Sequence, residues 1–141
     1  MLALSISDVR GFMVKLLKEE VFDDFQLRNA VVNTFARFEI YGVRDDSCVQ
    51  WREVRPHVFG LIKGDKPPKS IKIIFGKEME GSDADNPTSL FINIHFENGK
   101  VSLTTGLSKK GFSLDRYDGE KWDAQVIKFL DDNGITYINE I

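Results

Sequence analysis

The stretch LFINIHFENGKVSLTTG, residues 90–106, decides the fold because it carries the clearest local pattern in the chain. Apolar residues alternate with polar ones from Leu90 to Phe96, Asn98-Gly99 follows, and the alternation resumes at Val101. A period of two predicts strands, and Asn-Gly between two such runs is typical of a tight hairpin turn. The stretch therefore predicts an antiparallel hairpin, which argues against a doubly wound parallel sheet.

Further strands are expected on both sides of this hairpin. The extended region 25–41 has the same period and predicts either one bent strand or two strands joined near Asn33. Shorter strands are predicted at 2–6, 70–77 and 135–141. Two polar segments are predicted loops, 42–49 and 81–89.

Helical spacing of apolar residues recurs in separate segments. Residues 8–19 predict a helix with Ser7 as its N-cap, and residues 51–62 predict a second one. A third helix is expected to be capped by Asp118 and to end at Asn133-Gly134.

The order of these elements predicts an α+β fold. We expect a mostly antiparallel sheet of about six or seven strands, with three helices packed mainly on one face. At 141 residues, the chain is expected to form a single globular domain, 1–141.

Charge and cysteine content exclude several classes of protein. The net charge is −3 and the pI is about 5.4, which argues against a protein dedicated to nucleic acid. Cys48 is the only cysteine, so the chain fits a reducing cytoplasm. No apolar run approaches the roughly 18–20 residues that span a bilayer, so no membrane partner is expected.

The helix at 51–62 contains the most unusual residues of the chain. Pro56 is tolerated in a first helical turn and is costly deeper inside, so we expect the helix to begin nearer residue 53 or to be kinked at 52–56. A buried stripe is expected on one side: Val54, Val58, Leu61 and Ile62. This packing does not involve Arg52, Arg55 and His57, so their structural role is not explained by the helix.

No motif in the chain supports a metal, a cofactor or a catalytic group. The two histidines, His57 and His95, are far apart and lack partners at ligand spacing. The segment GLSKKGFS, 106–113, has the glycine frame of a phosphate-binding loop, but Phe112 stands where that loop needs lysine. Cys48 has no evident base and orienting group, so we expect no catalytic residue.

Lysines gather after the helix at 51–62. They could form a basic patch that docks an acidic partner or a phosphate-bearing ligand. The favoured interpretation is that they keep a loop soluble and protect a sheet edge. The set comprises Lys63, Lys66, Lys69, Lys72 and Lys77, with Lys109 and Lys110 further on.

Several segments together resemble a family of small bacterial proteins of unknown function, found mainly in clostridial Firmicutes. The resemblance covers nearly the whole chain and implies a bacterial cytoplasmic protein, but no activity, cofactor or site residue. The segments that carry it are LALSISDVRGFMVKLL (2–17), FDDFQLRNAVVNTFARFEIYG (22–42), WREVRPHVFGLIKG (51–64), SLTTGLS (102–108) and WDAQVIKFLDDNGI (122–135).

The leading hypothesis is a non-catalytic module that binds a protein partner or a small ligand, with a homodimer as one form. It is motivated by aromatic residues that the strands do not need for a core, Phe35, Tyr41 and Phe91.

Two alternatives remain open. One is a small-molecule-binding enzyme with a polar pocket between helix 51–62 and the sheet. The residues of that pocket would be Arg55, His57, Thr104 and Thr105. The other is a weak nucleic-acid binder that uses the lysines, which predicts strongly salt-dependent binding.

Overall fold

The computed structural model describes residues 1–45, 47–64, 67–78, 88–109 and 116–140. The helices of this described part are α1 (Val9–Leu17), α2 (Trp51–Ile62) and α3 (Arg116–Asp132). Its main sheet contains β1 (Ala3–Ile6), β2 (Gln26–Asn33), β3 (Arg37–Tyr41), β6 (Ser70–Glu78), β7 (Thr88–Glu97), β8 (Lys100–Lys109) and β9 (Tyr137–Asn139). A second, small sheet pairs β4 (Val43–Arg44) with β5 (Ser47–Cys48).

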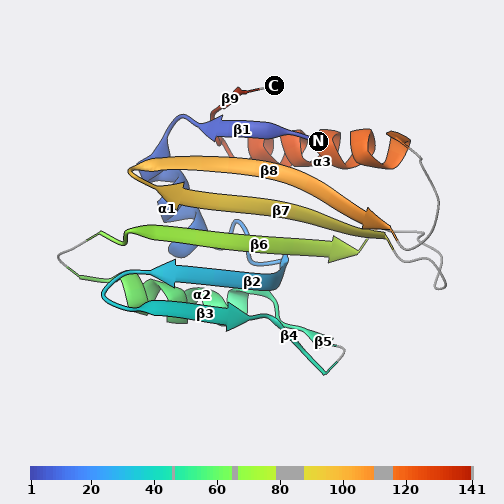
Figure 1. Cartoon of the computed structure of the whole chain (residues 1–141). Coiled ribbons are helices and arrows are strands. Elements are labelled where there is room, and N and C mark those ends of the chain that lie inside the picture. Colours follow the sequence, from blue (N-terminus) through green and yellow to red (C-terminus); the bar gives the residue numbers. More distant parts are fainter. Residues whose placement is uncertain (46, 65–66, 79–87, 110–115, 141) are drawn as a thin grey trace.

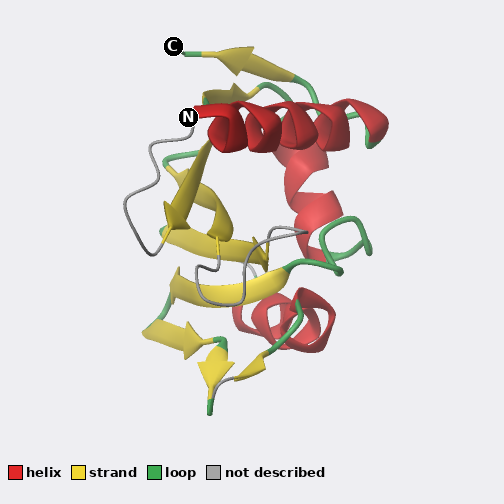
Figure 2. Ribbon diagram, turned by 90° about the vertical axis from the view of Figure 1, so that its right-hand side faces the viewer, coloured by secondary structure: helices red, strands yellow, loops and turns green. Residues whose placement is uncertain are grey.

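The main sheet has one face covered by helices and one face without them. Its strand order is β3-β2-β6-β7-β8-β1-β9, and each neighbouring pair of described strands is antiparallel (Figure 1). Figure 2 shows the helices together on one side of the strands. We call the opposite side the open face. This arrangement confirms the predicted α+β fold with helices packed on one face of an antiparallel sheet.

The predicted hairpin forms the centre of the sheet. Asn98 and Gly99 make the turn with positive φ angles of 54° and 72°, the conformation that favours Asn-Gly. The hairpin is longer than predicted, because its register runs from Glu97 opposite Lys100 to Thr88 opposite Lys109. Residues 88–89, predicted as loop, therefore belong to β7, while 79–87 lie outside the described residues.

Residues 25–41 form two strands, as one of the two alternatives predicted. The chain turns at residues 34–36, where Thr34 N donates to Ala36 O at 3.0 Å. The region 42–49 after β3 was predicted as a loop, and that prediction is wrong for Val43–Arg44 and Ser47–Cys48. There the pairs Val43–Cys48 and Arg44–Ser47 extend the chain into a short hairpin.

The helices begin at different residues than expected. Asp8 replaces Ser7 as the N-cap of α1, because its carboxylate accepts from Gly11 N at 3.0 Å. Helix α3 begins at Arg116, so Asp118 lies within its first turn.

Helix α2 begins at Trp51 despite Pro56. Tertiary hydrogen bonds fix this start, since Trp51 N donates to Phe25 O at 2.9 Å and Trp51 Nε1 donates to Leu16 O at 2.9 Å. The cost of a proline in the second turn is offset by this anchoring.

An aromatic cluster fills the space between the helices and the sheet. Phe22 stacks on Phe75 with ring centroids 5.6 Å apart, and Trp51 meets Phe75 edge-on at 5.2 Å. Phe129 of α3 meets Phe22 at 5.3 Å. Phe12 of α1 meets Phe22 edge-on at 5.6 Å, so all three helices contribute a ring to this core. Such ring pairs each stabilise the fold by about 0.5–1.5 kcal/mol beyond area burial.

Candidate functional site

Arg55, one of the predicted ligand-binding residues, is bound to a carboxylate. Its Nε and Nη2 atoms donate to the two oxygens of Asp23 at 2.8 and 3.0 Å, and both side chains are largely buried. These hydrogen bonds raise the pKa of Arg55 above its ordinary value. Arg55 therefore links α2 to the segment before β2.

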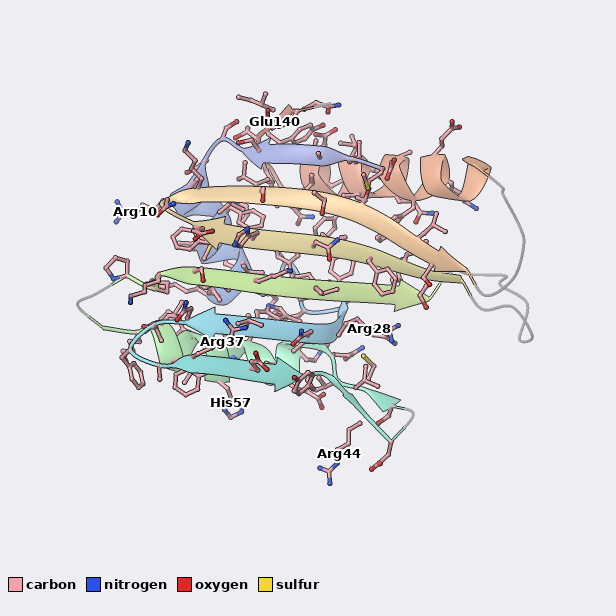
Figure 3. The ribbon with its side chains drawn as sticks, in the orientation of Figure 1. Arg10, Arg28, Arg37, Arg44, His57 and Glu140 are labelled. Carbon is pink, nitrogen blue, oxygen red and sulfur yellow. The ribbon has the colours of Figure 1, made fainter. Side chains whose placement is uncertain are left out.

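The other three predicted residues lie in different places. His57 is exposed on α2, and Figure 3 shows it projecting past the edge of β3. Thr105 faces the helices at 1% exposure, where Oγ1 accepts from Leu2 N at 2.8 Å and donates to Asp123 Oδ1 at 2.6 Å. Thr104 points to the open face and accepts from Asn93 Nδ2 at 3.2 Å.

Consecutive residues of a strand point to opposite faces, so Thr104 and Thr105 cannot line the same cavity. The structure therefore does not assemble the four residues into one pocket between α2 and the sheet. A ligand-binding role for any one of them stays a prediction.

A polar row crosses four neighbouring strands on the open face. The register places Lys72 of β6 opposite His95 of β7, His95 opposite Ser102 of β8, and Ser102 opposite Ser5 of β1. His95 Nε2 lies 3.4 Å from Glu97 Oε2, which forms an ion pair when the imidazole is protonated. The row places an ammonium, an imidazole and two hydroxyl groups side by side.

A hollow of about 410 Å³ lies at one end of this row, over β7, β8 and β1. Its volume falls within the roughly 300–1,000 Å³ of small-molecule sites. Most of its lining residues have hydrogen-bonding side chains, among them Ser5, His95, Ser102, Thr104 and Glu140. Figure 3 shows Glu140 beyond β1, and its backbone N–H donates to Ala3 O at 2.8 Å, which fixes the chain there.

A β-bulge adds two more polar residues to the open face. The register of β2 shifts between Leu27 and Asn29, so both Arg28 and Asn29 face away from the core. Arg28 lies over Gly76, where a Cβ would meet its guanidinium group. Within the described part of the chain, Arg28 Nε and Asn29 Oδ1 are buried without a hydrogen-bond partner.

The edge strand β3 carries a bonded group of three side chains on the same face. Arg37 donates to Glu39 Oε1 at 3.2 and 3.0 Å, and the Tyr41 hydroxyl donates to Glu39 Oε2 at 3.0 Å. The hydrogen bonds from Arg37 and then Tyr41 hold the pKa of Glu39 below its usual range. The hydrogen bond to Glu39 raises the pKa of Tyr41.

Two further hollows, of about 280 and 330 Å³, lie at the end of β6 on the helix side. They share Phe25, Lys77 and Phe129. Lys77 and Lys72 point to opposite faces of β6, so these two lysines do not belong to one basic patch. Lys66 and Lys110 lie outside the described residues.

Metal-binding and membrane-spanning features are absent from the part of the chain that the structure describes. There, no group of three His, Cys, Asp or Glu side chains could hold a metal ion. No helix in the same ranges is long and apolar enough to cross a membrane. Cys48 is half-buried, and its Sγ donates to Leu27 O at 3.0 Å.

Of the residues that line this hollow, only Thr104 was a predicted ligand-binding residue, and it was assigned to a different pocket, between helix 51–62 and the sheet. The hairpin pattern alone could have placed Ser102 beside His95, because the Asn98-Gly99 turn fixes the register of the two strands. No local signal pointed to Ser5 and Glu140, which come from the two ends of the chain.

Comparisons with known proteins give a family and no activity. The chain matches the model of a family of unknown function, DUF5721, over residues 15–138. This confirms the resemblance to a family without an assigned function, while its clostridial origin stays a prediction. No curated protein and no solved structure matches the chain.

Proposed function

We propose that this chain, which belongs to the DUF5721 family, is a non-catalytic module that binds a small polar ligand on the open face of its sheet. The observation that carries the proposal is the hollow over β7, β8 and β1, lined by hydroxyl, imidazole and carboxylate groups. Binding sites of this size fix their ligands with a few such polar groups.

The chemistry of the lining defines the class of ligand. Ser5, Ser102 and Thr104 supply hydroxyl groups that both donate and accept hydrogen bonds. Glu140 and Glu97 supply acceptors, and Lys100 supplies a donor. A small molecule with several hydroxyl groups, or with one amino and one carboxyl group, matches this mixture of donors and acceptors.

A binding role fits these groups better than a catalytic one. Hydroxyl nucleophiles need a base within hydrogen-bond reach and a third group that orients the base. His95 pairs with Glu97, but none of the hydrogen bonds among the described residues joins His95 to Ser102 or Ser5.

The single cysteine supports a cytoplasmic location for this module.

The test uses native mass spectrometry on protein purified without denaturation, followed by binding assays. The assay probes are a monosaccharide, a hydroxy acid and an amino acid. Ser102→Leu fills the hollow, whereas Ser70→Leu places the same side chain on the same face outside it. We expect the wild type and Ser70→Leu to bind a probe that Ser102→Leu binds at least about tenfold more weakly, about 1.4 kcal/mol. Equal affinity of the two variants would contradict the proposal.

A further inference from the structure

The outer edge of β3 is a strand edge without a partner in the described chain. β3 ends the strand order of the main sheet, and Figure 1 shows it as the lowest strand of that sheet, in front of α2, with the β4–β5 hairpin leaving at its end. At the other end of the sheet, β9 has only three residues, Tyr137–Asn139. Exposed edges of strands are templates for pairing with another chain.

The backbone groups that β3 presents outward can be identified from its pairing with β2. Gly42 N donates to Arg28 O at 3.1 Å, and Thr34 N donates to Ala36 O at 3.0 Å. Hydrogen-bonded pairs alternate along an antiparallel ladder, so Phe38 and Ile40 direct their backbone groups to β2. Arg37, Glu39 and Tyr41 consequently direct their N–H and C=O groups to the free edge.

The sequence of β3 is complementary to itself in one antiparallel register. With Phe38 opposite Phe38 of a second copy, Arg37 faces Glu39 of that copy and Glu39 faces its Arg37. Two opposite-charge pairs then form at hydrogen-bonded positions, which stabilises a strand pair. Shifting the register by two residues in either direction places Glu39 opposite Glu39 or Arg37 opposite Arg37, and like charges destabilise such pairs.

Aromatic side chains support the same register on the helix side of the sheet. Phe38 is half-buried, and its ring meets that of Phe35 edge-on at 5.4 Å. Phe35 is 83% exposed in the single chain. At a non-hydrogen-bonded pair the two Cα atoms lie about 4.5 Å apart, so the two Phe38 rings would touch and each Phe35 would join them.

We infer that a second copy of this chain pairs with the β3 edge, antiparallel and centred on Phe38. This interface goes beyond the proposed ligand site, which lies over other strands. The twofold axis runs perpendicular to the sheet, so the open faces of both copies continue into one surface with both hollows on the same side.

The test reverses the two charges separately and then combines the variants. Arg37→Glu places two glutamates opposite each other, and Glu39→Arg places two arginines opposite each other. Each variant alone is expected to dissociate at least about tenfold more readily than the wild type in analytical ultracentrifugation. Mixing the two variants restores both opposite-charge pairs, so an equal mixture is expected to form dimers.

Controls make the result independent of folding. Arg44→Glu alters a side chain that is 91% exposed on β4 and is expected to dimerise as the wild type does. Far-ultraviolet circular dichroism checks that each variant is folded. A wild type that stays monomeric over the concentration series, or a mixture that stays monomeric, overturns the inference.

A covalent trap tests the register directly. In a Cys48→Ser background, Phe38→Cys places two thiols across the twofold axis, within the distance that a disulfide spans. Tyr41→Cys is the matched control, because this position is 72% exposed but lies opposite residue 35 of the second copy. Mild oxidation is expected to cross-link the first variant and not the second, and preferential cross-linking of the second contradicts the register.

Discussion

Arg55 and Asp23 form a bidentate ion pair that joins α2 to the segment between α1 and β2. The Nε and Nη2 atoms of Arg55 donate to separate oxygens of Asp23, and Nη1 donates to Lys18 O at 3.4 Å. Asp23 is only 7% exposed, so the guanidinium group of Arg55 compensates for the water that its carboxylate loses on burial. The pair holds together elements that are 32 residues apart in the chain.

Arg55→Ala should therefore lower the stability of the fold. Removing the guanidinium group leaves the Asp23 carboxylate buried without a cation, which should reduce the free energy of unfolding by about 2–4 kcal/mol. Urea denaturation followed by tryptophan fluorescence measures the change.

Arg52→Ala is the matched control for this prediction. Arg52 pairs with Asp24, whose side chain is 93% exposed, and exposed ion pairs contribute less than about 1 kcal/mol. Equal losses in the two variants would show that Arg55 does not have the structural role assigned to it.

Thr105→Val should destabilise the protein, although the two side chains have nearly the same shape. The substitution removes the acceptor for Leu2 N and the donor to Asp123, at a cost of about 1–3 kcal/mol for the groups left unpaired. Thr104→Val changes the neighbouring residue on the open face and should cost less. Thermal denaturation of both variants measures the difference, and the reverse order would contradict the placement of the two hydroxyl groups.

Two glycines should respond to alanine with opposite signs. Gly60 lies in α2 with no atom within 4 Å of an added Cβ, so Gly60→Ala should stabilise the fold by about 0.5–1 kcal/mol. At Gly42 the added Cβ would meet the backbone carbonyl of Leu27, so Gly42→Ala should destabilise it. Urea denaturation of each variant measures these changes, and a stabilising Gly42→Ala would contradict the close approach of Gly42 to Leu27 of β2.

The hydrogen bonds among Arg37, Glu39 and Tyr41 on β3 predict that the stability of the fold changes with pH where Glu39 and Tyr41 titrate. Because the pKa of Glu39 is lowered, its contribution to stability is present above the pKa of the unfolded chain and is lost as pH falls through the folded value. Because the pKa of Tyr41 is raised, its contribution is present below the unfolded pKa and is lost as pH rises through the folded one.

Tyr41→Phe should raise the pKa of Glu39 towards its ordinary value, since it removes one donor. Glu39→Gln should lower the pKa of Tyr41, since it removes the charged acceptor that favours the protonated hydroxyl. Carbon-detected NMR titration follows both groups in the folded protein. Unchanged values in both variants would mean that the hydrogen bond between them does not form in solution.

Local patterns in the sequence were sufficient to predict most of the fold. Alternation and Asn98-Gly99 predicted the central hairpin, and helical spacing predicted α1, α2 and α3. The start of α2 could not be predicted, because it depends on hydrogen bonds from Trp51 to Phe25 and Leu16, which are distant in sequence. Tertiary contacts of this kind override the local preference against Pro56.

The candidate site was harder to predict than the fold. Arg55 was assigned to ligand binding because its partner, Asp23, is not recognisable from spacing. Thr104 and Thr105 could have been separated from sequence alone, since neighbours on a strand face opposite ways. The hollow combines Ser5 and Glu140 with the hairpin, and only the strand order places β1 beside β8 and β9 beside β1.

The most direct test of ligand binding on the open face is a chemical-shift map. A monosaccharide, a hydroxy acid and an amino acid are titrated into ¹⁵N-labelled protein, and shifts are assigned to residues. If the hollow binds the ligand, the shifts of a binding probe cluster at Ser5, His95, Ser102 and Thr104. Ser102→Leu then abolishes these shifts, and Ser70→Leu retains them. Shifts confined to the helix side, around Phe25 and Phe129, or no shifts with any probe, would contradict ligand binding in the hollow.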